Sequence, residues 1–416
     1  MNSRKNHFIS PSMNLLYEIT HAKRLPIPKK IQQKIIFGFK KEIIELFFRF
    51  TIFSIAIKTY KNPVLWVKVP LALDRKRREN IGTHRLQKLA QIEKTYFWGL
   101  YTPGWSWKSQ TFKNFIAGEM NRIVPFSKKS NRLTNAYVSI TKKCALQCEH
   151  CYEWDNLNKK ETLSQEELHQ TIEKLQNLGV ALIHFSGGEP LIKIDCIIEL
   201  IAKSRKGTDF WVLTSGFKLT SENAKKLKHA GLKGVIVSLD HFIPEEHNRF
   251  RGFKDAYFWV ETAVQNAIQN NLAVALSICL TKSFTTPENL MQYVLLAKKL
   301  GVTFVQFLEP RAVGHYANMD VDLKEEQIQL LEEFYLKLNY SSKYQDFPLI
   351  TYHGYNQRKM GCSGAGNRSL YIDSEGEANA CPFCQKKSGS FVYDDSSVVF
   401  TSLKSNGCQK FNHNTN

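Results

Sequence analysis

The chain has 416 residues, of which 43% are hydrophobic and 12% are aromatic. This length and composition predict a globular protein of two or three domains, and they exclude a disordered chain or a small disulfide-rich secreted domain. The formal net charge of +19 is concentrated in one part: residues 1–130 hold 25 Lys and Arg against 7 Asp and Glu, whereas residues 131–416 hold 32 against 31. This asymmetry favours an anionic partner for the N-terminal part, whether a membrane surface, a nucleic acid or a substrate.

An amphipathic helix is predicted over residues 32–58 of the basic part. Its polar positions form a narrow stripe on an otherwise apolar helix, at Lys34, Gly38, Lys41, Glu45 and Arg49. The pattern favours a core helix whose polar stripe is solvated; the alternative is a helix at a membrane interface, with the stripe toward anionic headgroups. The longest charge-free run, residues 50–57, is too short to cross a bilayer.

The N-terminus carries no apolar run long enough for a signal peptide, so we expect a reducing, cytoplasmic location, with peripheral membrane association as the alternative. No nucleic-acid recognition motif accompanies the positive charge. Nucleic acid is therefore not expected as a partner.

From residue 133 onward the chain alternates short apolar runs with helical patterns. Strands are expected at 136–140, 180–186, 210–215, 234–240, 273–280 and 303–309, and helices at 164–178, 194–206, 220–230, 255–270 and 287–300. Six β-α units in succession predict an α/β fold with a parallel sheet and right-handed crossovers, in the form of a partial (β/α)6 barrel. Its chemistry should lie at the carboxyl ends of the strands.

Polar segments follow five of the six predicted strands. They are the segment that begins at Cys144, "GGEP" at 187–190, "TSG" with Ser215, "SLDH" with Asp240 and His241, and "EPRAVG" with Arg311. Because the carboxyl ends of parallel strands meet at one edge, these segments predict a single site. One of Asp240 and His241 could act there as an acid or base, and Asp240 is the candidate we retain, with a helix cap as the plainer interpretation.

Three cysteines, Cys144, Cys148 and Cys151, lie within eight positions. Thiolates are ligands of zinc and of iron–sulfur clusters. A structural zinc site needs four ligands, and His150 could supply the fourth only in a strained loop. A cubane held by three thiolates leaves one iron open for another ligand, so a cluster explains why there are three; zinc and inert buried thiols stay as alternatives.

The pattern Cys144-x3-Cys148-x2-Cys151, followed by Tyr152, resembles the signature of the radical S-adenosylmethionine (SAM) superfamily, and the resemblance extends over residues 133–312. It implies a [4Fe-4S] cluster whose open iron binds SAM, and reductive cleavage of SAM to a 5′-deoxyadenosyl radical that abstracts hydrogen from the substrate. It also implies an electron donor such as flavodoxin or ferredoxin.

The same resemblance assigns SAM-binding residues, namely Gly187, Gly188, Glu189, Ser215, Ser277 and Arg311. The glycines permit close backbone approach, and Glu189 offers an acceptor for the SAM ammonium group. Each residue also has a plainer interpretation: a turn for "GGEP", a turn hydroxyl for Ser215, and a surface charge for Arg311.

Four more cysteines, Cys362, Cys381, Cys384 and Cys408, follow residue 312, where the β-α rhythm is expected to end. The stretch "SLYIDSEGEANAC" predicts a hairpin around a glycine turn. The spacing of the first two of these cysteines around Gly376 resembles the start of the SPASM extension of radical SAM enzymes. With four cysteines instead of seven or more it resembles the shortened twitch form, which implies one auxiliary [4Fe-4S] cluster. A zinc ribbon is the alternative, because two cysteines separated by two residues are also a zinc spacing.

Three parts are thus predicted: a basic, aromatic N-terminal region at 1–130, a radical SAM core at 131–312, and a Cys-rich extension at 313–416. We expect a radical SAM enzyme that modifies a peptide or protein. A small-molecule or lipid-linked substrate is the alternative, and a non-catalytic zinc or iron–sulfur protein is the alternative from another class.

Overall fold

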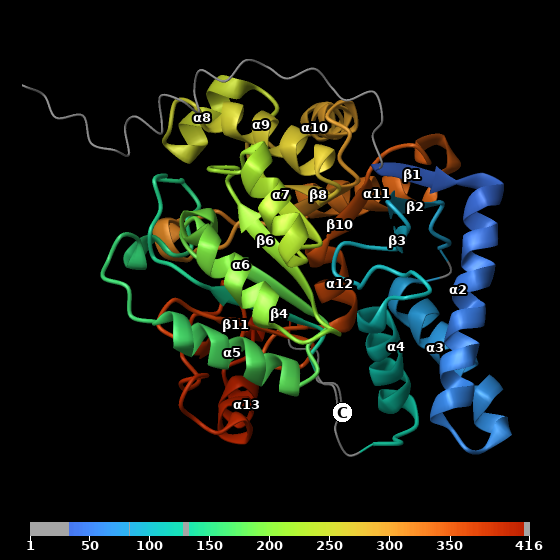
Figure 1. Cartoon of the computed structure of the whole chain (residues 1–416). Helices are drawn as coiled ribbons and strands as arrows, with labels where there is room; N and C mark the ends of the chain where they lie inside the picture. The colour runs from blue at the N-terminus through green and yellow to red at the C-terminus, as the bar shows by residue number, and fades with distance from the viewer. Residues whose placement is uncertain (1–32, 83, 128–132, 412–416) are drawn as a thin grey trace, which may run out of the picture.

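The computed structural model describes residues 33–411 except 83 and 128–132. Its main element is a nine-stranded sheet in the order β10-β9-β8-β7-β6-β5-β4-β11-β12. The seven consecutive parallel strands are β4 (Asn135–Ser139), β5 (Leu182–Ser186), β6 (Asp209–Thr214), β7 (Gly234–Ser238), β8 (Ala273–Cys279), β9 (Phe304–Leu308) and β10 (Leu349–Tyr352). The connecting helices lie outside this curved sheet, which forms a partial (β/α) barrel (Figure 1).

The helices of the barrel are α5 (Gln165–Asn177), α6 (Ile194–Lys203), α7 (Ser221–Ala230), α8 (Pro244–Arg251), α9 (Ala256–Gln269), α10 (Pro287–Lys299), α11 (Glu325–Tyr340) and α12 (His353–Met360). Local sequence explains several of their ends. Ser164 and Glu167 form a capping box at the start of α5, and Gly231 ends α7 in a left-handed conformation. All seven residues of β8 are buried, as expected for a parallel strand that is covered on both faces.

The predicted strands and helices between 133 and 312 are confirmed, but the prediction that the β-α rhythm ends at 312 is wrong. Helix α11 follows, and β10 pairs in parallel with β9. The short strand β10 has four residues, and an irregular segment separates β9 from α11, so hydrophobic periodicity did not reveal this unit. Helix α8 was also missed, because its eight residues "PEEHNRFR" are mostly polar.

The Cys-rich extension adds the two remaining strands to the same sheet. Strand β11 (Ser369–Ile372) pairs in parallel with β4, and β12 (Ala378–Asn379) pairs antiparallel with β11, which confirms the predicted hairpin. Helix α13 (Ser396–Ser405) follows the hairpin. The extension is therefore joined to the barrel by backbone hydrogen bonds along the first strand of the barrel.

The N-terminal region closes the other end of the barrel. Its small antiparallel sheet consists of β1 (Gln33–Phe37), β2 (Lys88–Ile92) and β3 (Thr95–Phe97). Phe97 of this sheet packs edge-on against Trp211 and Phe304 at ring-centroid distances of 6.4 and 5.9 Å. One buried cluster joins this sheet to the first residues of β5, β8, β9 and β10, so the sheet plugs the barrel at the amino ends of its strands.

Three helices complete the N-terminal region: α2 (Gly38–Thr59), α3 (Pro63–Ile81) and α4 (Gln110–Ile123). The helix predicted over 32–58 is partly wrong, because residues 33–37 form strand β1. The predicted orientation is also wrong: Lys41 of the polar stripe is buried, whereas Leu46 and Phe50 of the apolar side are exposed. Packing against other parts of the chain sets the rotation of α2, and the local sequence does not encode it.

In the described part of the chain, no helix combines the length and apolarity that a membrane span requires.

Candidate functional site

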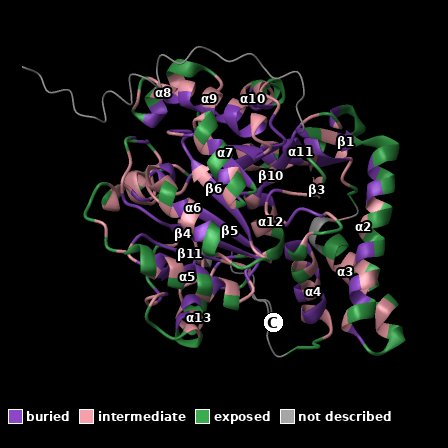
Figure 2. Cartoon of the chain, viewed as in Figure 1, coloured by how far each residue is buried: buried purple, intermediate pink, exposed green. Residues whose placement is uncertain are grey.

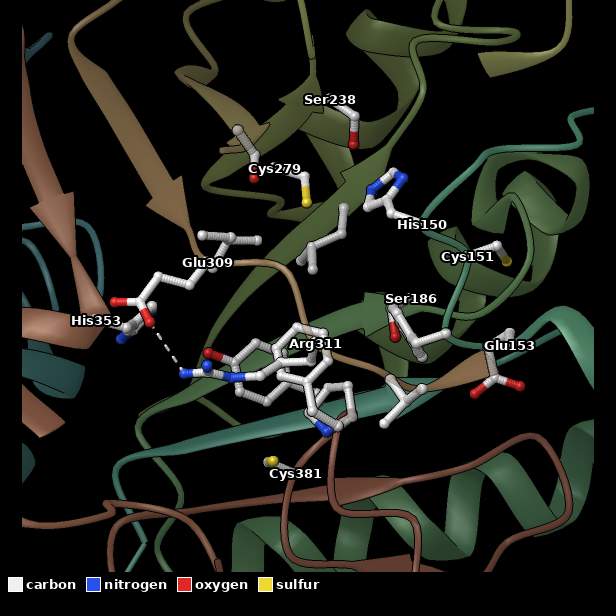
Figure 3. A pocket seen from close by; sticks show the side chains of 18 of the residues that line it. His150, Cys151, Glu153, Ser186, Ser238, Cys279, Glu309, Arg311, His353 and Cys381 are labelled. Carbon is white, nitrogen blue, oxygen red and sulfur yellow. Dashed lines mark ion pairs between the residues drawn. The ribbon is translucent and has the colours of Figure 1, made fainter. Parts of the chain in front are cut away.

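A cavity of about 470 Å³ lies at the carboxyl ends of the parallel strands. It is lined by all the proposed metal ligands, all the proposed SAM-binding residues and the retained acid–base candidate Asp240: Cys144, Cys148, Cys151, Gly187, Gly188, Glu189, Ser215, Asp240, Ser277, Arg311, Cys362, Cys381, Cys384 and Cys408. Figure 3 shows side chains from both halves of the sheet and from the C-terminal extension around this space. The sheet topology thus brings together segments that are up to 264 residues apart, from 144 to 408.

The loop that carries Cys144, Cys148 and Cys151 (the cysteine loop, residues 144–151) follows β4 and is held by three separate segments. The N–H groups of Gly188 and Glu189 donate to the carbonyls of residues 141 and 143, each at 2.8 Å. The N–H groups of residues 147 and 149 donate to carbonyls at the end of α8, at 3.2 and 3.0 Å. The His315 N–H donates to the Cys151 carbonyl at 2.9 Å. A loop with little regular structure is therefore fixed in one conformation.

The paired glycines serve this loop directly. A Cβ on Gly187 would lie 2.5 Å from the Thr141 carbonyl oxygen, and one on Gly188 would lie 2.3 Å from the Lys143 carbonyl oxygen. Gly187 also has a φ of +131°, which favours glycine. The close backbone approach that the sequence suggested thus occurs between the "GGEP" segment and the start of the cysteine loop.

The carboxylate of Glu189 is engaged by the protein itself. One oxygen accepts hydrogen bonds from the Leu191 N–H at 3.1 Å and the Thr214 hydroxyl at 2.7 Å, and the other accepts from Ser215. The residue is buried, and burial raises the pKa of its carboxyl group. Both carboxylate oxygens thus accept hydrogen bonds from the chain, and through them Glu189 also positions the end of β6.

Asp240 lies at the end of β7 beside the cysteine loop. Its Oδ2 pairs with the Arg251 guanidinium at 2.5 Å, and its Oδ1 accepts the Cys279 N–H at 3.0 Å. Desolvation raises the pKa of Asp240, but the charge of Arg251, the nearby His150 and His247 and the Cys279 N–H together outweigh it, so the net shift is downward. A paired carboxylate with a lowered pKa is a weak proton acceptor, so its contacts fit a positioning role. His241 does not line the cavity; its Nδ1 accepts the Ile243 N–H at 3.0 Å.

Arg251 connects this ion pair to the cysteine loop. Its Nη1 lies 3.5 Å from the Cys148 sulfur. The arginine ends α8, the helix that sequence patterns missed, so this contact could not be anticipated. A guanidinium at this place favours the thiolate form of the cysteine electrostatically.

Arg311 enters the cavity from the segment after β9. Its guanidinium pairs with Glu309 at 3.3 Å, as the dashed line in Figure 3 marks, and with Asp322 at 3.7 Å. It also lies over the ring of Phe411, 5.4 Å from the centroid. The plainer interpretation of a surface charge is therefore wrong, because the side chain is largely buried in the cavity wall.

The four C-terminal cysteines line the same cavity, and Figure 3 shows one of them, Cys381, across the cavity from Ser238 at the end of β7. The Cys384 N–H donates to the Cys381 carbonyl at 3.1 Å, and the Cys362 N–H donates to the Phe411 carbonyl at 3.2 Å, which brings the last segment beside the first cysteine. Hydrogen bonds from the thiols of Cys362 and Cys384 lower the pKa of Cys408.

Across residues 33–411, gaps excepted, no three Cys, His, Asp or Glu side chains are gathered as a single metal ion requires. In an iron–sulfur cluster each thiolate binds its own iron, so the sulfurs need not converge on one point. Three thiols on one loop and four in the extension, all on the wall of one cavity, fit the donor sets of two clusters.

The extension also contacts the cysteine loop at Tyr152, the residue after Cys151. The ring of Phe383, which lies between Cys381 and Cys384, meets the Tyr152 ring edge-on at 6.0 Å. The Gln385 amide donates to the Tyr152 carbonyl at 2.7 Å. The two cysteine groups are therefore held in a fixed relation by direct packing.

Sequence reasoning identified Ser277 but missed other residues of the cavity wall, among them its two neighbours Ser238 and Gln306. Ser238, Ser277 and Gln306 stand at paired positions of β7, β8 and β9, so they form one polar row across the inner face. This row could have been found by aligning the predicted strands. Tyr101 comes from the N-terminal region and packs against His353, at a ring distance of 4.7 Å. No local signal predicts this contact, because it joins the plug to the far edge of the sheet.

Comparison with known proteins agrees with this geometry. Residues 138–288 match the family model described as Radical SAM superfamily. Fe-coproporphyrin III synthase of Methanosarcina barkeri is 37% identical over 146 residues, which cover 35% of this chain and 36% of that protein. GTP 3′,8-cyclase of Campylobacter jejuni is 29% identical over 222 residues, which cover 51% of this chain and 66% of that protein.

Among solved structures, that of Streptococcus suis SuiB bound to precursor peptide SuiA resembles this chain in fold. The TM-score is 0.53 at 11% sequence identity, and the match covers 84% of this chain and 80% of that chain. The chain spans only 36% and 66% of the two curated relatives. These likenesses support the fold and the shared domain, and the substrate has to be argued from the site.

Proposed function

We propose, starting from the radical SAM domain that residues 138–288 of this chain form, that the protein is an enzyme which cleaves SAM reductively and modifies a peptide or protein substrate. The observation that carries the proposal is the convergence of the three cysteines, the "GGEP" segment and Arg311 on one cavity at the carboxyl ends of the strands. Enzymes of this superfamily use a [4Fe-4S] cluster and SAM. When bound, these cofactors supply a 5′-deoxyadenosyl radical that removes a hydrogen atom from the substrate.

Cys144, Cys148 and Cys151 would hold the catalytic cluster. The Leu146 N–H lies 3.4 Å from the Cys144 sulfur, and Arg251 lies 3.5 Å from the Cys148 sulfur. Both donors favour thiolate ligands over neutral thiols. Burial raises the pKa of Cys144 and Cys151 to about 12, and the Leu146 N–H opposes this rise at Cys144. Three thiolates would leave one iron of such a cluster free to bind SAM.

The residues around the cavity would orient SAM. Arg311 supplies a cation near the end of β9, suited to the SAM carboxylate or ribose, and Ser277 supplies a hydroxyl in the polar row of the inner face. Glu189 accepts hydrogen bonds from the N–H and the hydroxyl of Ser215, so the backbone at the end of β6 has a defined orientation toward the cavity. Gly187 and Gly188 contribute by holding the "GGEP" backbone against the cysteine loop.

Apolar side chains would shield the radical chemistry from water. Leu146 and Cys148 pack with Phe217 and Trp259 in one buried cluster next to the cavity. A dry wall of this kind excludes solvent, which would otherwise quench reactive species.

The C-terminal cysteines would hold an auxiliary [4Fe-4S] cluster, which would supply a redox centre able to accept or donate an electron. Four protein thiolates would leave no open iron, so the substrate would not bind to this cluster directly. The edge-on contact between Phe383 and Tyr152 gives the two cysteine groups a direct structural connection. We place the enzyme in the cytoplasm, where a flavodoxin or ferredoxin can deliver the electron that SAM cleavage needs.

A peptide or protein substrate is supported by the SPASM-like extension and by the likeness to SuiB, whose structure was solved with a precursor peptide. A small-molecule substrate is the second candidate, because the matched GTP 3′,8-cyclase is named for a nucleotide substrate. Arg311 and the polar row of β7–β9 suit either class, since both present carboxylate, phosphate or hydroxyl groups.

The test is release of 5′-deoxyadenosine by anaerobically reconstituted protein with a strong reductant. Host extract is split into a peptide-containing fraction, the same fraction after protease digestion, and a small-molecule filtrate. We expect release by the wild type, none by Cys148→Ala, and stimulation that protease digestion abolishes. Stimulation by the filtrate alone would transfer the proposal to a small metabolite. Absence of SAM cleavage in a protein that carries its full iron content would overturn the enzymatic proposal.

A further inference from the structure

Among the described residues, the helical hairpin α2–α3 exposes an apolar surface. On α2 it consists of Phe39, Ile43, Leu46, Phe47, Phe50 and Ile57, and on α3 it consists of Val64, Val67 and Leu71. Each of these side chains exposes 40% or more of its surface. Exposed apolar groups are common singly, but a contiguous patch of this extent marks an interaction site. We call these nine residues the α2–α3 face.

The way in which α2 packs on the rest of the protein determines which of its side chains are exposed. The members of the α2–α3 face on α2 recur at intervals of three and four, so they form one side of the helix. The opposite side is buried through Ile44, Thr51 and Ile55. The Trp105 indole donates to the Thr51 hydroxyl at 3.2 Å, which sets the rotation of the helix.

The polar stripe of α2 supports the same orientation. Lys41 is buried and pairs with Glu45 at 2.7 Å, and Arg85 from outside the helix binds both Glu42 and Glu45. The acidic groups of α2 are thus used in contacts to the body of the protein. Figure 2 shows exposed residues along the outer side of α2, and Figure 1 places this helix at the outer edge of the molecule, with α4 nearer the sheet.

Basic side chains surround and interrupt the α2–α3 face. They are Lys40, Arg49 and Lys58 on α2, Lys61 in the turn, and Lys68 and Arg75 on α3, and all six are exposed. None of them forms an ion pair with another residue of the part that the structure describes. Lys68 and Arg75 stand one helical turn from Val64 and Leu71, so charge and apolar surface share one side of α3. The hairpin, residues 38–81, holds ten Lys and Arg against four Asp and Glu.

We propose that the α2–α3 face docks on the surface of a membrane that contains anionic lipids. Exposed apolar side chains together with exposed basic side chains decide the class of partner. Nucleic acid would leave the phenylalanines in water, and a neutral protein surface would leave the six cations without partners. An anionic lipid interface satisfies both, because acyl chains take the apolar side chains and headgroups take the ammonium and guanidinium groups. Trp107, which is 52% exposed and meets Phe47 edge-on at 5.7 Å, extends the face with a side chain suited to such an interface.

The test uses the full-length protein and co-sedimentation with vesicles of phosphatidylcholine alone or mixed with phosphatidylglycerol. We expect binding to the mixed vesicles and much weaker binding to the neutral ones. Binding to the mixed vesicles should weaken in high salt, because the screening length falls from about 10 Å at 0.1 M to about 3 Å at 1 M. No binding to either kind of vesicle would overturn the proposal.

Two variants separate the apolar and the charged contributions. Leu46→Ser with Phe50→Ser, at sites 67% and 60% exposed, should lower the partition coefficient on mixed vesicles at least tenfold. Met319→Ser with Val398→Ser, also exposed but outside the hairpin, is the matched control and should bind as the wild type does. Lys61→Gln, Lys68→Gln and Arg75→Gln together should weaken binding to mixed vesicles by on the order of a hundredfold. The control for charge is Lys206→Gln, Lys225→Gln and Lys299→Gln.

Other occupants of the face give distinct outcomes. A dimer that Leu46→Ser with Phe50→Ser converts to monomer, together with no vesicle binding, would show that the face joins two copies of the chain and would overturn the proposal. Equal loss in the matched controls would also overturn it. All the substituted side chains are exposed and lie outside the cavity, so SAM cleavage without vesicles should be unchanged, and the outcome is independent of the proposed reaction.

Discussion

Glu189 and Ser215 are joined twice, because the N–H and the hydroxyl of Ser215 both donate to Oε2 of the glutamate, at 2.8 and 2.6 Å. The other carboxylate oxygen accepts from Leu191 and Thr214. One buried side chain therefore ties the loop after β5 to the end of β6. This relation places two walls of the cavity relative to each other.

Replacing Glu189 with Gln should destabilise the protein. The NH2 group of an amide cannot accept hydrogen bonds, so the N–H or hydroxyl donors that face it would lose their acceptor. We therefore expect a loss of about 1–3 kcal/mol in the free energy of unfolding. Denaturant titration of the protein without cofactors measures this loss. Glu333→Gln, at an exposed site, is the matched control and should be neutral. Wild-type stability combined with lost SAM affinity would instead show that the carboxylate serves the ligand.

Replacing Gly188 with Ala should disturb the cysteine loop. The added Cβ would lie 2.3 Å from a backbone oxygen, which cannot move without shifting residues 142–144, so we expect a cost of about 1–3 kcal/mol and reduced iron incorporation. Gly99→Ala is the control, because its nearest neighbour would lie at 3.8 Å. Unfolding titrations and iron analysis of both variants provide the comparison. If both variants incorporate iron normally, the close packing does not hold the loop.

Breaking the ion pair between Asp240 and Arg251 should be costly. Arg251→Met leaves a buried carboxylate without its partner, so we expect a loss of about 3–5 kcal/mol. The double variant Asp240→Leu with Arg251→Met should lose less than the sum of the single changes. Arg249→Met, which removes an exposed pair with Glu246, should cost less than about 1 kcal/mol. Additive losses in the double variant would show that the two groups do not interact.

Lys88 should make stability depend on pH. It is fully buried, its ammonium donates to the carbonyls of Leu338 and Tyr344, and desolvation lowers its pKa to about 7. The unfolded chain then binds more protons than the folded one between about pH 7 and its ordinary pKa of about 10.4, so stability rises with pH in this window.

The slope should approach about 1.4 kcal/mol per pH unit at the steepest point and should vanish below about pH 7, where both states are protonated. Denaturant titrations of the wild type and of Lys88→Met between pH 6 and about pH 10 test this, with the Met variant losing the Lys88 contribution to the slope. A slope that persists unchanged in Lys88→Met would assign it to other groups.

Iron content should separate the two cysteine groups. After reconstitution, the wild type should hold about eight iron atoms per chain, and both Cys148→Ala and Cys384→Ala should fall to about four, with the auxiliary cluster lost in the second. Cys196→Ala, on α6 and outside the cavity, should retain about eight. Two zinc ions per chain without labile sulfide would contradict both cluster assignments.

Much of the barrel and of its site could be predicted from the residues alone. The strands β5 to β9 are buried and mainly apolar, and the helices between them have clear caps, so their order and their common edge follow from local patterns. Parallel topology then requires that Cys144, Gly188, Ser215 and Arg311 meet at that edge. The hairpin of the extension was also evident, because Gly376 stands between two alternating arms.

Only the tertiary structure decided which elements from distant parts of the chain contact one another. Three contacts join residues that are far apart in the chain, and no local periodicity encodes them. Strands β2 and β3 close the barrel, Tyr101 packs against His353, and β11 pairs in parallel with β4. The rotation of α2 is the clearest example. An amphipathic pattern defines two sides of a helix, but which side is covered depends on what the rest of the chain packs against it, and here Trp105 and Arg85 select the side that carries Lys41.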